Sequence, residues 1–78
     1  MSLYFFDTYD GDEPVVDDEG LEIADLDTVK LEAVRGLADL ARDLLPGSER
    51  RELAVLVRDN KSRHILKTVV IFETQFLI

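Results

Sequence analysis

The sequence predicts an α+β fold in the order ββαββ: one antiparallel sheet of three to four strands, with a single helix packed on one face. Residues 26–45 repeat apolar side chains at helical spacing. The stretches on either side alternate as β-hairpins do, and each contains a polar turn, at residues 10–12 and 59–62. The chain has 78 residues and is expected to form one small domain, residues 1–78.

The first hairpin begins in an aromatic segment. Residues 4–9 are rich in Tyr and Phe, which is typical of a strand. The Asp-Gly-Asp turn at residues 10–12 tolerates the positive φ of a tight turn. A second strand starts at residues 15–16, is interrupted at residues 17–20 and resumes at residues 21–23.

The helix is expected to begin at Asp25 or Asp27, since either carboxylate can cap it, and to end before Pro46 and Gly47. Gly36 weakens it slightly and leaves room for a close backbone approach. One stripe is expected to pack on the sheet. It consists of Leu26, Val29, Ala33, Leu37, Leu40 and Leu44.

The second hairpin joins strands at residues 52–58 and 64–76, and the last strand is apolar on both sides. Leu66, Val70, Phe72 and Phe76 share one side, and Ile65, Val69, Ile71 and Leu77 share the other. Only one side can face the helix. The other needs a dry neighbour, because monomers seldom expose large apolar patches.

The helix carries a second apolar band beside its core stripe, so two elements have surplus apolar surface. We therefore expect a homodimer, formed through the open sheet face, the second helix band or the edge of the last strand. In the alternative, the C-terminal residues fold back over the helix. The residues expected in the dimer interface are Leu31, Val34, Ala38, Leu45, Val69 and Ile71.

Composition narrows the function classes. Cysteine is absent, which excludes disulfides and thiolate metal sites. Neither a signal peptide nor a stretch of membrane-spanning length is present, so we expect a cytoplasmic protein that does not enter a membrane. The net charge is −8, and residues 1–27 hold ten carboxylates without a basic residue. Such a chain is repelled by nucleic-acid phosphate at long range.

No group of residues predicts a catalytic centre or a cofactor site. The one histidine, His64, follows a turn without a second histidine or a cysteine to share a metal. The acidic N-terminal run supplies weak metal candidates, at Asp10, Asp12, Asp17 and Asp18. Its spacing does not fit a calcium-binding loop, so we interpret it as a solvated, turn-forming segment.

Basic residues concentrate on the second hairpin, which could contact phosphates as a β-ribbon. The residues of this reading are Arg58, Lys61, Arg63 and Lys67. We favour the alternative that the basic residues of this hairpin pair with the acidic N-terminal third, in the same molecule or across a dimer, because the net charge opposes an encounter with nucleic acid.

The chain resembles a family of short uncharacterised proteins abundant in soil and root-nodule bacteria and catalogued as a domain of unknown function. It departs from that family at residues 59–62, where members often have a glycine. Part of the chain, residues 4–45, is also similar to antitoxins of the HicB type, which implies a protein-partner role. The family resemblance rests on Tyr4-Phe5-Phe6-Asp7, Asp10-Gly11, residues 17–21, Glu32-Ala33 and residues 52–59.

The leading functional hypothesis is a non-enzymatic interaction module. We expect a homodimer that recognises another protein through its acidic N-terminal loops or a sheet edge. The alternative is a small regulatory protein that contacts nucleic acid through the second hairpin. No nucleophile, base and orienting group are grouped in the sequence, so we do not expect an enzyme.

Overall fold

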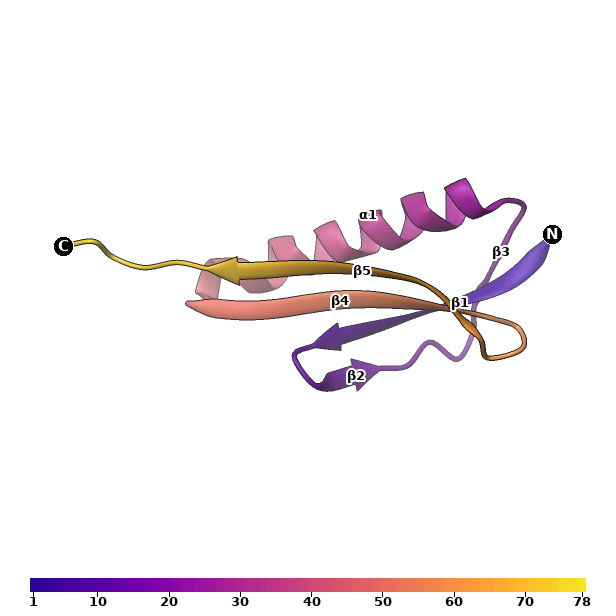
Figure 1. Ribbon diagram of the computed structural model, residues 1–78, viewed down its shortest axis with the longest axis horizontal. Coiled ribbons are helices and arrows are strands. Elements are labelled where there is room, and N and C mark those ends of the chain that lie inside the picture. Colours follow the sequence, from indigo (N-terminus) through magenta and orange to yellow (C-terminus); the bar gives the residue numbers. More distant parts are fainter.

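The computed structural model describes all 78 residues, which form one long helix and a five-stranded antiparallel sheet (Figure 1). The elements are β1 (Ser2–Asp10), β2 (Glu13–Val15), β3 (Leu21–Ile23), α1 (Leu26–Leu44), the short 3₁₀ helix η1 (Leu45–Gly47), β4 (Arg50–Asp59) and β5 (His64–Glu73). The predicted α+β class is confirmed. The predicted count of three to four strands is too low, because the interrupted second strand forms two separate strands, β2 and β3.

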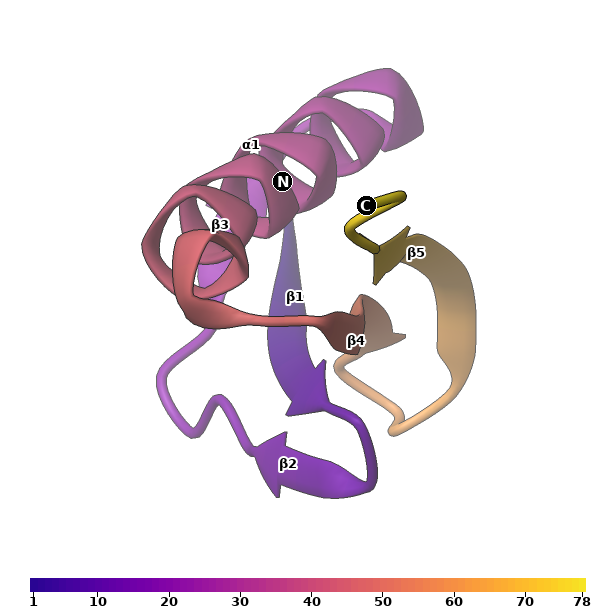
Figure 2. The ribbon, with the colours of Figure 1, turned by 90° about the vertical axis from the view of Figure 1, so that its left-hand side faces the viewer.

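The strand order is β2-β1-β4-β5, and β3 also pairs with β1. One edge of β1 pairs with β4, and the other pairs with β3 near its start and with β2 near its end. At the far side of the sheet, β5 pairs only with β4. Figure 2 shows α1 on one side of the curved sheet, with β2 and β5 at opposite margins. One edge of the sheet is thus made by short strands and the other by a strand of 10 residues.

The core lies between α1 and the sheet face that it covers. Val29, Ala33 and Leu37 of the helix are buried against the inward side chains of β4. Those strand residues are Leu53, Val55 and Val57, every second position of an extended chain. Half-buried Tyr4, Phe6, Leu66 and Val70 surround this cluster.

Both helix ends are capped by local groups. The Asp25 carboxylate accepts a hydrogen bond of 2.8 Å from the Thr28 amide, which holds the pKa of Asp25 below its usual value. Leu26, expected in the core stripe, is 62% exposed because it lies in the first turn, before the buried stretch begins at Val29. The helix ends at Leu44, one residue earlier than expected, and Leu45 starts η1 half-buried against the core.

The second hairpin is longer at its start and shorter at its end than predicted. Arg50 and Arg51 belong to β4, and β5 ends at Glu73, before Phe76. The predicted two-sided alternation is confirmed, since even-numbered residues from Leu66 to Phe72 are half-buried and odd-numbered ones are exposed. Residues 74–78 continue past the sheet (Figure 1). The alternative in which they fold back over the helix is therefore wrong.

Two glycines have opposite surroundings. Gly20 has a φ of 75°, and a Cβ added there would lie 2.9 Å from Cε2 of Phe5 and 3.0 Å from Cδ1 of Leu3. The segment before β3 therefore lies close over these two side chains of β1. An added Cβ at Gly36 meets nothing within 4 Å, so the predicted close backbone approach at this glycine is wrong. No helix has the length and apolar character that crossing a membrane requires.

We expect Gly20→Ala to lower the free energy of unfolding by about 1–2 kcal/mol, because alanine is strained at positive φ and its methyl group displaces Phe5 and Leu3. The matched control, Gly36→Ala, is expected to raise it by about 0.5–1 kcal/mol through helix propensity alone. Urea unfolding followed by circular dichroism measures both. Equal effects of the two substitutions would contradict this account of residue 20.

Candidate interaction surface

An aspartate fills the gap between β2 and β3. β1 pairs with β3 through Ser2, Leu3 and Tyr4 and with β2 from Thr8 onwards, which leaves Phe6 without a strand partner on this outer edge. The Phe6 amide donates instead to Oδ2 of Asp17, at 3.0 Å. Oδ1 of Asp17 accepts from the amides of Glu19 and Gly20. Burial alone would raise the pKa of Asp17, but the hydrogen bonds from these three amides together lower it by more. The pKa of Asp17 therefore lies below its usual value.

A buried ion pair supports the same gap from the adjacent strand. Arg58 of β4 donates from Nε to Oδ2 of Asp7 at 2.7 Å and from Nη2 to Oδ1 at 3.1 Å. Nη2 also donates to the Asp17 carbonyl, and the Asp17 amide donates to Asp7. The hydrogen bonds from Arg58 hold the pKa of Asp7 below its usual value, and the Asp7 side chain is only 6% exposed. Three separate segments thereby share one polar cluster.

The aromatic neighbour completes the cluster. The guanidinium carbon of Arg58 lies 4.8 Å from the ring centre of Phe5, its direct partner across the β1–β4 pair. Phe5 also underlies Gly20. The outer half of the sheet face opposite the helix is therefore covered by the chain's own residues 17–20, and is not an open apolar surface.

A second ion pair fastens the end of the helix. Arg51 donates to both carboxylate oxygens of Asp10, and its Nη1 donates to the Leu44 carbonyl at 3.3 Å and to Oγ of Ser48 at 2.9 Å. Asp10 lies at the end of β1 and Leu44 in the last turn of α1. Arg51 thus joins the sheet to a carbonyl that the helix leaves unpaired. Its hydrogen bonds hold the pKa of Asp10 below the usual value.

The hairpin turn is held by Asp59. Its carboxylate accepts from the amides of Lys61 and Arg63, each at 2.9 Å, and from Nε of Arg63 at 2.7 Å. The Arg63 amide is the main reason that the pKa of Asp59 is lowered. Ser62 has a φ of 63°, a conformation that favours glycine, at the place where the sequence departs from its resembled family.

The structure separates the candidate metal residues. Asp10 binds Arg51 and Asp17 binds backbone amides, while Asp12 and Asp18 are exposed. No group of three or more potential metal ligands comes together. The predicted pairing of the basic hairpin with the acidic N-terminal third holds within one molecule for Arg51 and Arg58, whereas Arg50 and Arg63 pair with carboxylates of the hairpin itself.

Lys61, Arg63 and Lys67, the other residues predicted to contact nucleic acid, do not share the environment of Arg58. Arg58 is 20% exposed and engaged on Asp7, whereas Arg63 is 71% exposed but contacts Asp59. Lys61 and Lys67 are exposed, and neither forms an ion pair. His64, the single histidine, is exposed at the start of β5.

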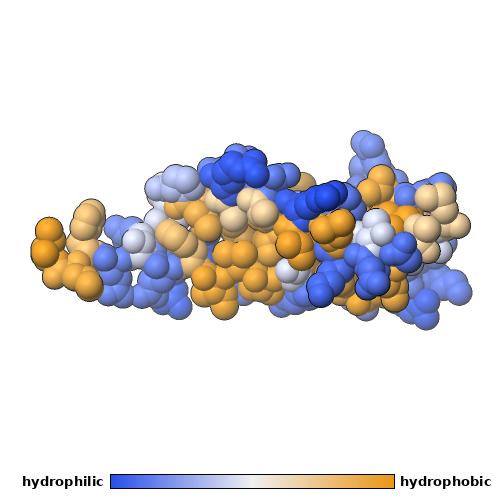
Figure 3. Space-filling view, turned by 90° about the horizontal axis from the view of Figure 1, so that it is seen from above, coloured by the Kyte–Doolittle hydropathy of each residue, from blue (hydrophilic) through white to orange (hydrophobic).

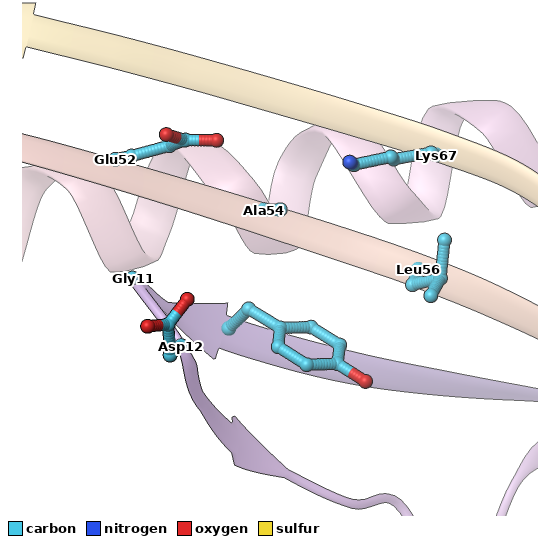
Figure 4. Close-up of a pocket in the computed structure, with 7 residues that line it drawn as sticks. Gly11, Asp12, Glu52, Ala54, Leu56 and Lys67 are labelled. Carbon is cyan, nitrogen blue, oxygen red and sulfur yellow. The ribbon is translucent and has the colours of Figure 1, made fainter.

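A shallow pocket lies on the sheet face opposite the helix (Figure 4). Ala54 and Leu56 of β4 form its floor, and Glu52, Asp12 and Lys67 stand around it. Its lining, which also includes Tyr9 and Gly11, contains no serine, cysteine or histidine. The small side chain of Ala54 between larger neighbours accounts for the hollow.

The apolar surface gathers on the side formed by α1 and β5. Leu31 and Val34 of the helix are 48% and 44% exposed, and Ala38 is exposed on the same band. On β5, Val69 and Ile71 are 39% and 74% exposed, and they point away from the helix, on the same face as Lys67. Figure 3 shows apolar side chains along the middle of this side and the apolar tail at one end. Leu45, the remaining predicted interface residue, packs on the core of its own chain instead.

The two edges of the sheet differ in protection. The outer edge of β1 carries two strands of three residues, and β2 contains Glu13 and Pro14, which disfavour further pairing. The edge of β5 runs for 10 residues and contains no proline. Apart from His64 at its start, its only ionisable residues are Lys67 and Glu73. An exposed edge of that length is a template for another strand.

The total surface is large for the size of the chain. A folded monomer of 8.9 kDa is expected to expose about 4,800 Å², whereas this chain exposes 5786 Å². The excess, about 1,000 Å², is close to what one partner buries in a standard interface. Thirteen large apolar side chains are exposed, against eight buried apolar residues. The chain therefore exposes more surface than a folded monomer of its mass is expected to expose.

A family profile described as "Domain of unknown function (DUF6894)" matches residues 3–71, nearly the whole chain. The chain belongs to this family. The resemblance to a domain of unknown function is thereby confirmed. A search of curated proteins and a search of solved structures each found no match.

We expect Asp7→Asn to lower the free energy of unfolding by about 2–3 kcal/mol at neutral pH, because Arg58 stays in place with its counter-charge removed. The matched control is Asp39→Asn, whose pair with Arg42 is exposed and contributes about 0.5 kcal/mol or less. Urea unfolding measures both. Equal losses would contradict a special role of the buried pair.

The same variant has a predicted pH dependence. A carboxylate whose pKa is lowered by folding stabilises the folded state above its unfolded pKa, about 3.9, and this contribution is lost as pH falls through the folded value. The difference in stability between the natural chain and Asp7→Asn should therefore be constant near neutral pH and shrink below about pH 4. A difference that is unchanged down to pH 2–3 would contradict the assignment.

Proposed function

We propose that the protein is a non-enzymatic protein-interaction module that acts as a cytoplasmic homodimer. One observation supports this most strongly: the margin of the molecule formed by α1 and β5 exposes apolar side chains of both elements. Leu31, Val34 and Ala38 are exposed on α1, and Val69 and Ile71 are exposed on the face of β5 that points away from the helix. A second copy joined along this margin gives a closed, symmetric assembly.

The acidic loops are the proposed contact for a further protein. Asp12 and Asp18 are exposed and carry no ion pair. Asp18 follows β2, and Asp12 stands at the pocket on the sheet face opposite the helix. A dimer joined on the β5 side leaves them accessible. The resemblance of residues 4–45 to HicB-type antitoxins also favours a protein as the partner.

The alternative, nucleic-acid binding through the second hairpin, rests on Lys61, Arg63 and Lys67. Arg58 contributes little to it, because Asp7 already neutralises its charge. With a net charge of −8, we expect no gel shift of mixed-sequence DNA or RNA at low salt. A shift that Lys61→Ala and Arg63→Ala abolish would favour the alternative.

We expect the natural chain to sediment as a dimer and Val34→Glu to sediment as a monomer, because a charge at the interface is desolvated without a partner. The matched control is Arg35→Glu, an adjacent exposed position on the polar face of α1, which should remain dimeric. Analytical ultracentrifugation over a concentration series measures both, with circular dichroism to show that each variant is folded. A natural chain that stays monomeric throughout, or a control that dissociates equally, would contradict the proposed dimer surface.

A further inference from the structure

We infer that two copies join edge to edge, with β5 pairing antiparallel to β5 of the second copy so that the two Val70 residues lie opposite each other. This inference rests on the proposed homodimer and specifies how it forms. It turns the five strands of one chain into a single sheet that runs through both copies, with both helices on the same face.

The backbone of β5 is prepared for such pairing. The Thr74 amide donates to the Glu49 carbonyl at 2.8 Å, in line with the β4–β5 register that pairs Glu73 with Arg50. Alternate residues of an antiparallel strand direct both backbone groups to the same neighbour. Phe72, Val70 and Thr68 therefore bond to β4. The residues that direct N–H and C=O to the open edge are Lys67, Val69, Ile71 and Glu73.

The charges on this edge select the register. In an antiparallel pair of β5 strands, a residue whose backbone groups face the open edge must lie opposite another such residue. This holds whenever the twofold axis passes through a residue of β5, so the allowed registers differ in which residue lies on the axis. With the axis at Val70, Lys67 lies opposite Glu73, and Val69 lies opposite Ile71. Moving the axis to Val69 or Ile71 places each of these charged side chains opposite an uncharged one. Lys67 forms no ion pair within its own chain, and Glu73 forms an ion pair with exposed Arg50 and accepts a hydrogen bond from exposed Gln75.

The helices fit this arrangement. α1 packs mainly over β4 and next over β5, so its axis lies between one and one and a half strand spacings from the twofold axis. Two helices related by that axis are then about 10–14 Å apart, since strands are spaced by about 4.8 Å. The lower part of this range is the distance at which packed helices contact. The band of Leu31, Val34 and Ala38, which the monomer leaves exposed, would meet its own copy there.

The same register gives the tail a place. Thr74 would lie opposite Leu66 of the second copy, and Phe76 opposite His64. Phe76 and Leu77 are each 93% exposed in the single chain, where the tail runs past the end of the sheet (Figure 1). If the tail continues β5 as an extended strand, Phe76 lies on the same side as Leu66, Val70 and Phe72 and extends that apolar row over the second copy.

Charge favours a second copy as the occupant of this edge. Residues 1–27, with ten carboxylates and no basic residue, form the strands at the other margin. Residues 28–78 hold nine basic and seven acidic residues, a local charge of +2. Two chains of net charge −8 can therefore approach through their β5 edges while their acidic segments stay at the outer ends of the joined sheet.

Single-cysteine variants test the register, because the natural chain has no cysteine. Val70→Cys is expected to form a disulfide-linked dimer under mild oxidation, since residues opposite each other at the twofold axis bring their Cβ atoms close. Thr68→Cys and Phe72→Cys, on the same side of β5, serve as controls. Each alone should remain uncrosslinked, and mixing them should give a linked heterodimer, because residue 68 lies opposite residue 72.

The outcomes separate the two proposals. Self-crosslinking of Thr68→Cys or Phe72→Cys in place of Val70→Cys would overturn the register while the homodimer stands. A link only between Val70→Cys and Thr68→Cys, or only between Val70→Cys and Phe72→Cys, would place the axis at residue 69 or 71 and overturn the register. A natural chain that sediments as a dimer, with no crosslink in any of the three variants alone or in pairwise mixtures although each is folded, would overturn pairing through β5. A chain that is monomeric at all concentrations would overturn the homodimer itself.

Discussion

The fold depends on how one gap in a strand ladder is closed. β2 and β3 pair with opposite ends of β1, and the amide of Phe6 between them would be unpaired without the Asp17 carboxylate. An unsatisfied buried amide costs about 1–3 kcal/mol, and a carboxylate among strands needs a counter-charge. Arg58 supplies that charge through Asp7 and also holds the Asp17 carbonyl. This cluster lets a segment rich in acidic residues lie on the sheet.

Closing that edge makes the molecule asymmetric. The side of β1 away from β4 ends in short strands, Pro14 and acidic loops, all of which oppose further pairing. Nothing comparable protects β5, where Lys67 and Glu73 are spaced among apolar residues. The sheet face beside Asp7 is covered by the chain's own residues 17–20, whereas Val69 and Ile71 of β5 remain exposed. The polar cluster and the open edge are thus two consequences of one strand order.

Local sequence patterns predicted the helix and the strands. The contacts that these patterns did not predict depend on how strands far apart in the sequence pair. Helical spacing identified α1, and the acidic, glycine-containing residues 17–20 correctly marked a break, which proved long enough to make two strands. Leu26 and Leu45 were misplaced because periodicity does not show where a helix leaves its sheet. Asp7 and Arg58 lie 51 positions apart, and only the β1–β4 register brings them together. The sequence offered one signal for this buried ion pair: Asp7 lies between Phe5 and Tyr9 on the same side of the predicted strand.

The small size of the chain connects this polar cluster to the proposed assembly. Eight buried apolar residues provide a modest core, and fixing the sheet edges by hydrogen bonds adds order without adding buried apolar area. The remaining apolar side chains could be covered only by lengthening the chain or by a second copy. Because ten of the 17 acidic residues lie within residues 1–27, whose strands form the other margin, a second copy meets little repulsion at β5. Segregating charge at one margin is therefore what makes the other margin available for self-association.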